Sequence, residues 1–236
     1  MKIKIFKPQS VITSAIKNIK TKYTKLRPAF LNGCSKDCFE AFKPIRYQRC
    51  GSLADIHIFC ALNFPDTFLQ VINLSDGNNI LRTMCRLHNM TKGKVKFPPV
   101  IETFKNKKCK YDGDYADDII RLNRTSNNIS STLAHEIAHY NHEQFCENYL
   151  KMGKKSEIEA DGITDFSILE NFMKDKAALK IIKKHLGNYA TSSPCEMVAC
   201  TFESLFNGKI LPTEIWELYN KYEGPFAQLL KPLFAK

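Results

Sequence analysis

Apolar side chains recur at helical spacing through the second half of the chain. Ser126 and Asn128 are capping candidates, and after them apolar residues return every three or four positions, which predicts a helix through Ile129, Leu133, Ile137 and Tyr140. Such spacing forms an apolar stripe along the helix and leaves another face for polar side chains.

Further helices are predicted at about 157–185, 194–206 and 213–222. Ser156 and Ser193 stand where helix caps are expected. The residue after Ser193 is proline, which suits the first position of a helix because its missing amide proton has no partner there.

The first half of the chain has shorter apolar runs. Residues 56–62 predict a buried strand or helix and residues 67–74 another apolar element, while Ser-Asp-Gly-Asn-Asn at 75–79 predicts a turn. The later runs are predicted to be an extended segment at 94–104, a turn at 111–114 and a strand at 118–122. The fold class expected is α+β, with a small mixed sheet preceding a mainly helical C-terminal half.

Charge divides the chain unevenly. Residues 1–50 hold twelve Lys and Arg against two acidic residues, whereas the rest is nearly balanced within a net charge of +11. The apolar residues of this basic part recur at steps of three and four, which predicts an amphipathic helix: Ile12, Ile16, Ile19, Tyr23 and Leu26. We therefore expect a basic amphipathic segment at 1–45 and a catalytic domain at 46–236.

The basic helix could contact an acidic membrane surface or an acidic partner, or form part of a translocation signal. Nucleic-acid binding is not expected, because the segment has few aromatic residues. No apolar run approaches the ~20 residues of a membrane span, so neither a transmembrane helix nor a standard secretory signal is expected. Nine cysteines without a C-x-x-C pair favour a reducing compartment. We expect a monomer.

The predicted helix after Asn128 contains His135-Glu136-Ile137-Ala138-His139. Histidines four residues apart project from one face of a helix, so His135 and His139 can share one zinc ion. Glu136 then lies beside the metal, where it can take a proton from water and pass it to a leaving amine. The motif predicts a zinc-dependent peptidase, with a non-catalytic zinc-stabilised binding module as the alternative.

A third zinc ligand is required, and the residues that follow offer two carboxylates, with His142 and His185 as alternative ligands. The metzincin pattern fails, because position 142 is His where Gly is expected and position 145 is Phe where the third His belongs. One candidate is Glu157, in a Glu-x-x-Ala-Asp element similar to that of several zinc proteases, with Asp161 orienting a histidine. The other candidate is Glu196.

The stretch from Tyr189 to Phe202 resembles the catalytic domain of anthrax lethal factor and related secreted zinc endopeptidases. In that group a Tyr stands seven residues before the ligand Glu, as Tyr189 stands before Glu196, and Ala199 and Phe202 match the helix that follows. Cys200 replaces the second Glu of the group. The resemblance covers roughly residues 100–220 as an order of motifs.

The resemblance implies a zincin-like fold, with an edge strand over the active-site helix formed by residues 118–122 and pairing with an extended protein substrate. It implies that Glu196 completes the zinc site with His135 and His139, and that the Tyr189 hydroxyl donates to the oxyanion. It also implies a bacterial effector or toxin, secreted without a classical signal peptide and cleaving a protein in host cytosol. The alternative is a cytoplasmic peptidase that uses Glu157.

Overall fold

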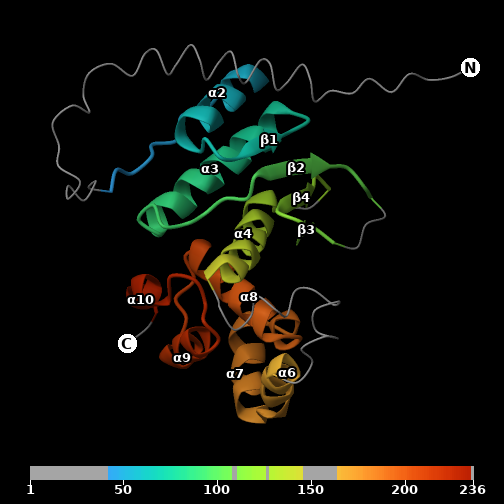
Figure 1. The fold of residues 1–236 in the computed structure, drawn as a ribbon, viewed down its shortest axis with the longest axis vertical. Helices are drawn as coiled ribbons and strands as arrows, with labels where there is room; N and C mark the ends of the chain where they lie inside the picture. The colour runs from blue at the N-terminus through green and yellow to red at the C-terminus, as the bar shows by residue number, and fades with distance from the viewer. Residues whose placement is uncertain (1–41, 108–110, 126–127, 146–163, 235–236) are drawn as a thin grey trace, which may run out of the picture. The chain divides into compact units, whose positions relative to one another are not determined.

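The sheet and helices expected from the pattern are both present (Figure 1). The computed structural model describes residues 42–107, 111–125, 128–145 and 164–234, which form eight α-helices, two short 3-10 turns and one four-stranded mixed sheet. The α+β class is therefore confirmed. The basic helix expected at 12–26 and the candidate ligand Glu157 lie outside the described residues. The domain boundary expected after residue 45 stays a prediction.

The sheet is built from β1 (Phe68–Gln70), β2 (Val100–Phe104), β3 (Gly113–Ala116) and β4 (Ile119–Asn123), in the order β1-β2-β4-β3. β2 pairs in parallel with both β1 and β4, whereas β3 pairs antiparallel with β4. The strand expected at 118–122 is present as β4, but its expected place at the edge is wrong. β4 is an interior strand because β3 covers its outer side.

β4 is an interior strand because the chain forms a tight hairpin between β3 and β4. Asp117 and Asp118 both have positive φ, 52° and 59°, as the two central residues of a tight type I′ turn require. The turn therefore lies at these two residues and not at 111–114, where Gly113 and Asp114 already belong to β3. The strand at the edge of the sheet, next to the helix with the histidines, is β3.

The turn expected at 75–79 is also wrong, because these residues lie inside α3 (Leu74–Met90). The Asn73 side chain caps this helix by accepting a hydrogen bond from the Asp76 amide. Gly77 faces Ile56 of α2 (Leu53–Asn63) so closely that a Cβ atom would overlap the Ile56 side chain. The glycine that favoured a turn thus serves here as a close helix contact.

The C-terminal half is helical, as expected. The described helices are α4 (Ile129–Phe145), α6 (Thr164–Lys174), α7 (Lys176–Leu186), α8 (Pro194–Phe206), α9 (Thr213–Lys221) and α10 (Ala227–Leu230). The described part of the helix expected at 157–185 is divided at Asp175, whose side chain caps α7. The helices expected at 194–206 and 213–222 are confirmed as α8 and α9.

Helix α4 packs against α3, β3, β4 and α8 (Figure 1). Leu133, Ala134, Ile137 and Ala138 are fully buried. Ser131 and His135 lie on a different face of the helix, and their side chains reach residues of α8. None of the helices in the described residues is long and apolar enough to span a membrane.

Candidate metal centre

Two capped helix starts bring the site together. The Asn128 side chain accepts a hydrogen bond from the Ser131 amide at the start of α4, and the Ser193 hydroxyl accepts one from the Glu196 amide at the start of α8. Glu196 can take part in this cap and also act as a metal ligand, because the cap uses its backbone amide and leaves its carboxylate available. The Glu196 carboxylate lies in the first turn of α8, where the helix dipole favours a negative charge.

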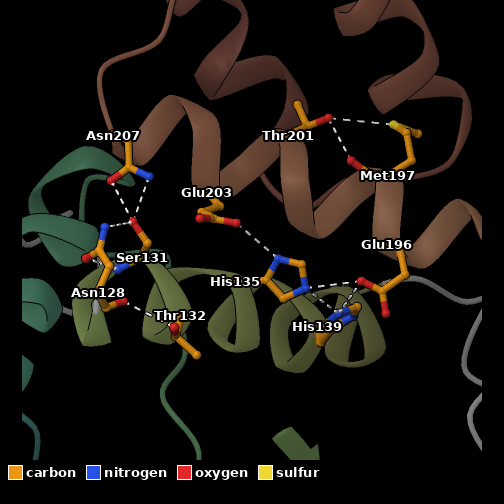
Figure 2. A network of polar contacts seen from close by, with 10 residues as sticks. All are labelled: Asn128, Ser131, Thr132, His135, His139, Glu196, Met197, Thr201, Glu203 and Asn207. Carbon is orange, nitrogen blue, oxygen red and sulfur yellow. Dashed lines mark hydrogen bonds and ion pairs between the residues drawn. The ribbon is translucent and has the colours of Figure 1, made fainter. Parts of the chain in front are cut away.

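Three ligand atoms meet between α4 and α8 (Figure 2). The Nε2 atom of His135 lies 3.1 Å from Oε2 of Glu196 and 3.2 Å from Nε2 of His139. The Nε2 atom of His139 lies 3.5 Å from the same Glu196 oxygen. The two nitrogens and one oxygen thus form a triangle.

The size of this triangle fits a tetrahedral zinc ion. Zinc binds histidine nitrogen and carboxylate oxygen at about 2.0–2.1 Å, which separates any two ligand atoms of a regular tetrahedron by about 3.3 Å. The three measured edges, 3.1, 3.2 and 3.5 Å, lie around that value. His135, His139 and Glu196 therefore present a suitable donor set, and they leave one tetrahedral position for a further ligand.

Cys200 lies next to this triangle. Its sulfur, a nitrogen of His135 and a carboxylate oxygen of Glu196 all lie within 4.8 Å of one another, in a largely buried cluster that could hold a metal ion. Cys200 stands four residues after Glu196 on α8 and therefore faces α4 from the same side of the helix.

The charges of the site favour a cation. Burial lowers the pKa of His135, but hydrogen bonds to Cys200, Glu196 and Glu203 outweigh that effect and raise its pKa well above the ordinary value. Burial raises the pKa of Glu196, whereas hydrogen bonds to His135 and His139 outweigh it and hold the pKa well below its usual range. Positive charge at these imidazoles, from protons or from a metal ion, stabilises the carboxylates around them.

Glu136 lies beside the cluster and is only 8% exposed. Burial raises the pKa of its carboxyl above the ordinary value, although the neighbouring His139 and His135 act in the opposite direction. A carboxylate with a raised pKa is a better proton acceptor near neutral pH. The expected general base thus has an environment that suits the role.

Tyr189 begins the 3-10 turn Tyr189–Thr191, just before α8, and is 61% exposed. Its ring centroid lies 6.0 Å from that of His135, and its hydroxyl makes a hydrogen bond with the Glu196 carboxylate. Burial of the hydroxyl, followed by the negative charge of Glu196, raises its pKa above the ordinary value. The phenol therefore keeps its proton at neutral pH and can donate it in a hydrogen bond.

Sequence reasoning missed Glu203. Its Oε2 atom lies 3.3 Å from Nδ1 of His135, on the side of the ring opposite Glu196 (Figure 2). A spacing signal was present, because Glu203 follows Glu196 by seven residues, which is about two helical turns. This spacing indicates a contact between Glu203 and His135 only once α8 is known to pack against α4.

The other described histidines do not join the cluster. His142 lies about two helical turns beyond His135 along α4, where it is buried and its Nε2 atom lies 3.0 Å from the Tyr222 carbonyl oxygen. His57 stacks on Phe68, and His88 packs against aromatic rings of the N-terminal half. His185 lies in the last turn of α7 and does not belong to the cluster. Among the described residues, the site therefore draws its imidazoles from His135 and His139.

No protein-family model, curated protein or solved structure matches this chain. The resemblance of the Tyr189–Phe202 stretch to secreted zinc endopeptidases therefore stays a prediction from its motifs. The site has to be interpreted from its own geometry and chemistry.

Proposed function

We propose that this protein is a zinc-dependent endopeptidase whose metal is held by His135, His139 and Glu196. The observation that carries the proposal is the triangle of two imidazole nitrogens and one carboxylate oxygen, with edges of 3.1–3.5 Å. Glu136 lies beside this triangle, and the Tyr189 hydroxyl lies at Glu196. A site for hydrolysis needs a metal, a base and a donor for the oxyanion, and this arrangement offers a residue for each.

Zinc bound here would act as a Lewis acid, polarising the peptide carbonyl and lowering the pKa of water to about 7. Glu136 takes the proton of the attacking water as the carbon–oxygen bond forms. It then delivers that proton to the peptide nitrogen as the carbon–nitrogen bond breaks. One water is consumed, and Glu136 returns to its ionised form.

Tyr189 stabilises the negative charge that develops on the peptide oxygen. Its hydroxyl is a protonated donor, and the largely exposed ring is open to an incoming substrate. One well-placed donor of this kind lowers the barrier by about 3 kcal/mol.

The free side of β3 is the strand edge that supports a protein substrate. Within the described residues β3 pairs only with β4, so its other side keeps unpaired backbone groups. A Cβ atom on Gly113 would lie 2.6 Å from Thr132, and the rings of Tyr115 and Tyr140 meet at 5.6 Å. β3 thus runs beside the part of α4 that contains both histidine ligands. An extended peptide can add to such an edge by backbone hydrogen bonds.

The experiment that tests this function uses Glu136→Gln, which keeps the size of the side chain but cannot accept the proton. Zinc-loaded wild type and variant are incubated with cell lysates, and newly formed protein N-termini are compared. New N-termini with wild type alone support an endopeptidase. Equal binding of zinc by both proteins, with no new N-termini from either, would instead support a zinc-stabilised binding module.

A further inference from the structure

Helices α4 and α8 face each other through a row of polar pairs, here called the polar seam. It consists of the pairs Ser131–Asn207, His135–Glu203 and His135–Glu196, with His139 beside the last pair (Figure 2). The residues from α8 follow one another at steps of seven and four, which places them on one face of the helix. The metal centre is therefore one end of a longer helix–helix contact.

His135 faces a carboxylate at each ring nitrogen. Oε2 of Glu196 lies 3.1 Å from Nε2, and Oε2 of Glu203 lies 3.3 Å from Nδ1. Neutral imidazole carries one proton, so the two carboxylates compete for it. Only the tautomer with its proton on Nδ1 leaves an Nε2 lone pair facing His139 and Glu196.

We propose that Glu203 is a positioning residue of the metal centre, which accepts the Nδ1 proton of His135 and so keeps the Nε2 lone pair directed at the metal position. This inference rests on the metal site of the proposed function and extends it to the other side of the ring. Without Glu203, no carboxylate faces Nδ1, and Glu196 favours a proton on Nε2. A metal ion must then displace that proton without a carboxylate to hold the remaining one on Nδ1.

The removal of Glu203 is expected to weaken zinc binding. A hydrogen-bonding partner behind a histidine ligand typically changes metal affinity by roughly 10–100-fold, and we expect Glu203→Ala to raise the zinc Kd by that factor. Glu203→Gln keeps an acceptor oxygen but loses the charge, so its Kd should lie between those of wild type and Glu203→Ala.

Ser131→Ala is the matched control. Ser131 belongs to the polar seam and bonds to Asn207 at 2.8–3.1 Å, but no hydrogen bond joins it to either imidazole in the described residues. Its loss should lower the denaturation temperature and leave the zinc Kd unchanged. A role of Glu203 that was merely structural would make the two variants behave alike.

Two readouts that need no activity are used on the full chain. Competition with a chromophoric chelator gives the zinc Kd, and nitrogen-15 NMR of the zinc-loaded protein, labelled in its histidines, reports the Nδ1 proton of His135. The expected result is an Nδ1–H signal protected from exchange with water in wild type and Ser131→Ala, and loss of that protection in Glu203→Ala. An unchanged zinc Kd and an unchanged Nδ1–H signal in Glu203→Ala would overturn the proposal.

The outcomes also separate this inference from the proposed function. A wild type that binds no zinc overturns both. Tight zinc binding in wild type and Glu203→Ala alike, with cleavage that depends on Glu136, overturns only the role of Glu203. Weakened binding in Glu203→Ala with no cleavage by wild type supports the positioning role and overturns the peptidase.

Discussion

Nε2 of His135 lies 3.1 Å from Oε2 of Glu196, although 61 positions separate the two residues along the chain. The contact joins the helix of the H-E-x-x-H motif to the first turn of α8. It forms because the apolar side of α4 is buried elsewhere in the core, and because the cap at Ser193 orients the start of α8. This relationship makes Glu196, and not a residue adjacent in sequence, the expected third ligand.

Glu196→Ala should abolish tight zinc binding. The loss of a direct ligand should raise the zinc Kd by at least roughly 100-fold, the upper end of the effect of residues behind the ligands. Zinc content after dialysis, measured by atomic absorption, checks this expectation. Glu157→Ala serves as the matched control, because it removes the rival carboxylate; loss of zinc from that variant and its retention in Glu196→Ala would reverse the assignment.

Tyr189→Phe should affect turnover and little else. Removal of one oxyanion donor lowers kcat by roughly 100–1000-fold. KM should stay as in wild type, since the ring remains, and the assays are run with saturating zinc because the hydroxyl also bonds to Glu196. Because the side chain is 61% exposed, the free energy of unfolding should change by less than about 0.5 kcal/mol. Steady-state kinetics on a peptide derived from an identified cleavage site provides the measurement, and an unchanged kcat would exclude Tyr189 from the mechanism.

His142 should make the protein less stable in mild acid. Burial lowers its pKa to about 4, and His139 acts in the same direction, whereas the hydrogen bond with the Tyr222 carbonyl and the charge of Glu223 oppose the shift. The unfolded chain therefore binds the proton first. Stability is fully present above the unfolded pKa of about 6.5 and is lost as pH falls to about 4, by about 3 kcal/mol at most.

His142→Gln tests this pH dependence. Glutamine can place an amide nitrogen near the Tyr222 carbonyl but does not titrate. Urea denaturation of the metal-free proteins between pH 4 and pH 8 should show a steeper loss of stability in wild type than in the variant. Parallel curves for the two proteins would rule His142 out as a source of acid sensitivity.

Gly77→Ala should destabilise the fold, although alanine is favoured over glycine in a helix interior by about 1 kcal/mol. The added methyl group would overlap Ile56 and lie 3.2 Å from Cγ2 of Val71. Ile56 is fully buried, and such overpacking typically costs about 1–3 kcal/mol. We expect the packing effect to exceed the helix propensity.

A double-mutant cycle with Ile56→Val isolates the cause of that loss. The valine lacks the Cδ1 atom that the new methyl group would overlap. Chemical denaturation should therefore show that Ile56→Val costs stability in the wild-type background but restores it in Gly77→Ala. Simple additivity of the two changes would show that the overlap with Ile56 is not the cause.

Local signals were sufficient for α4, α8 and α9. Their apolar spacing, and the cap of α8 at Ser193 followed by Pro194, depend on residues a few positions apart, and the structure confirms these helices. The sequence of α4 also determined that His135 and His139 share one face, because four residues make about one turn of any α-helix.

Tertiary contacts decided the rest. Asn78 appears in the sequence as part of a turn, but in the structure it is a buried helix residue that bonds to Tyr47 and to the backbone of Cys50. That outcome depends on packing with residues far away in the sequence. The hairpin of β3 and β4 is an exception, because the two-residue turn at Asp117 and Asp118 that makes β4 an interior strand is a local feature that sequence reasoning missed.

The sequence by itself thus determined two imidazoles on one helical face and a glutamate between them. Only the tertiary structure decided that Glu196 approaches both imidazoles, that Glu203 lies behind His135, and that β3 is the free edge beside α4. The physical reason is the range of the interactions: helix periodicity and caps act within a few residues, whereas a shared metal site requires distant segments to be packed together by the burial of the core.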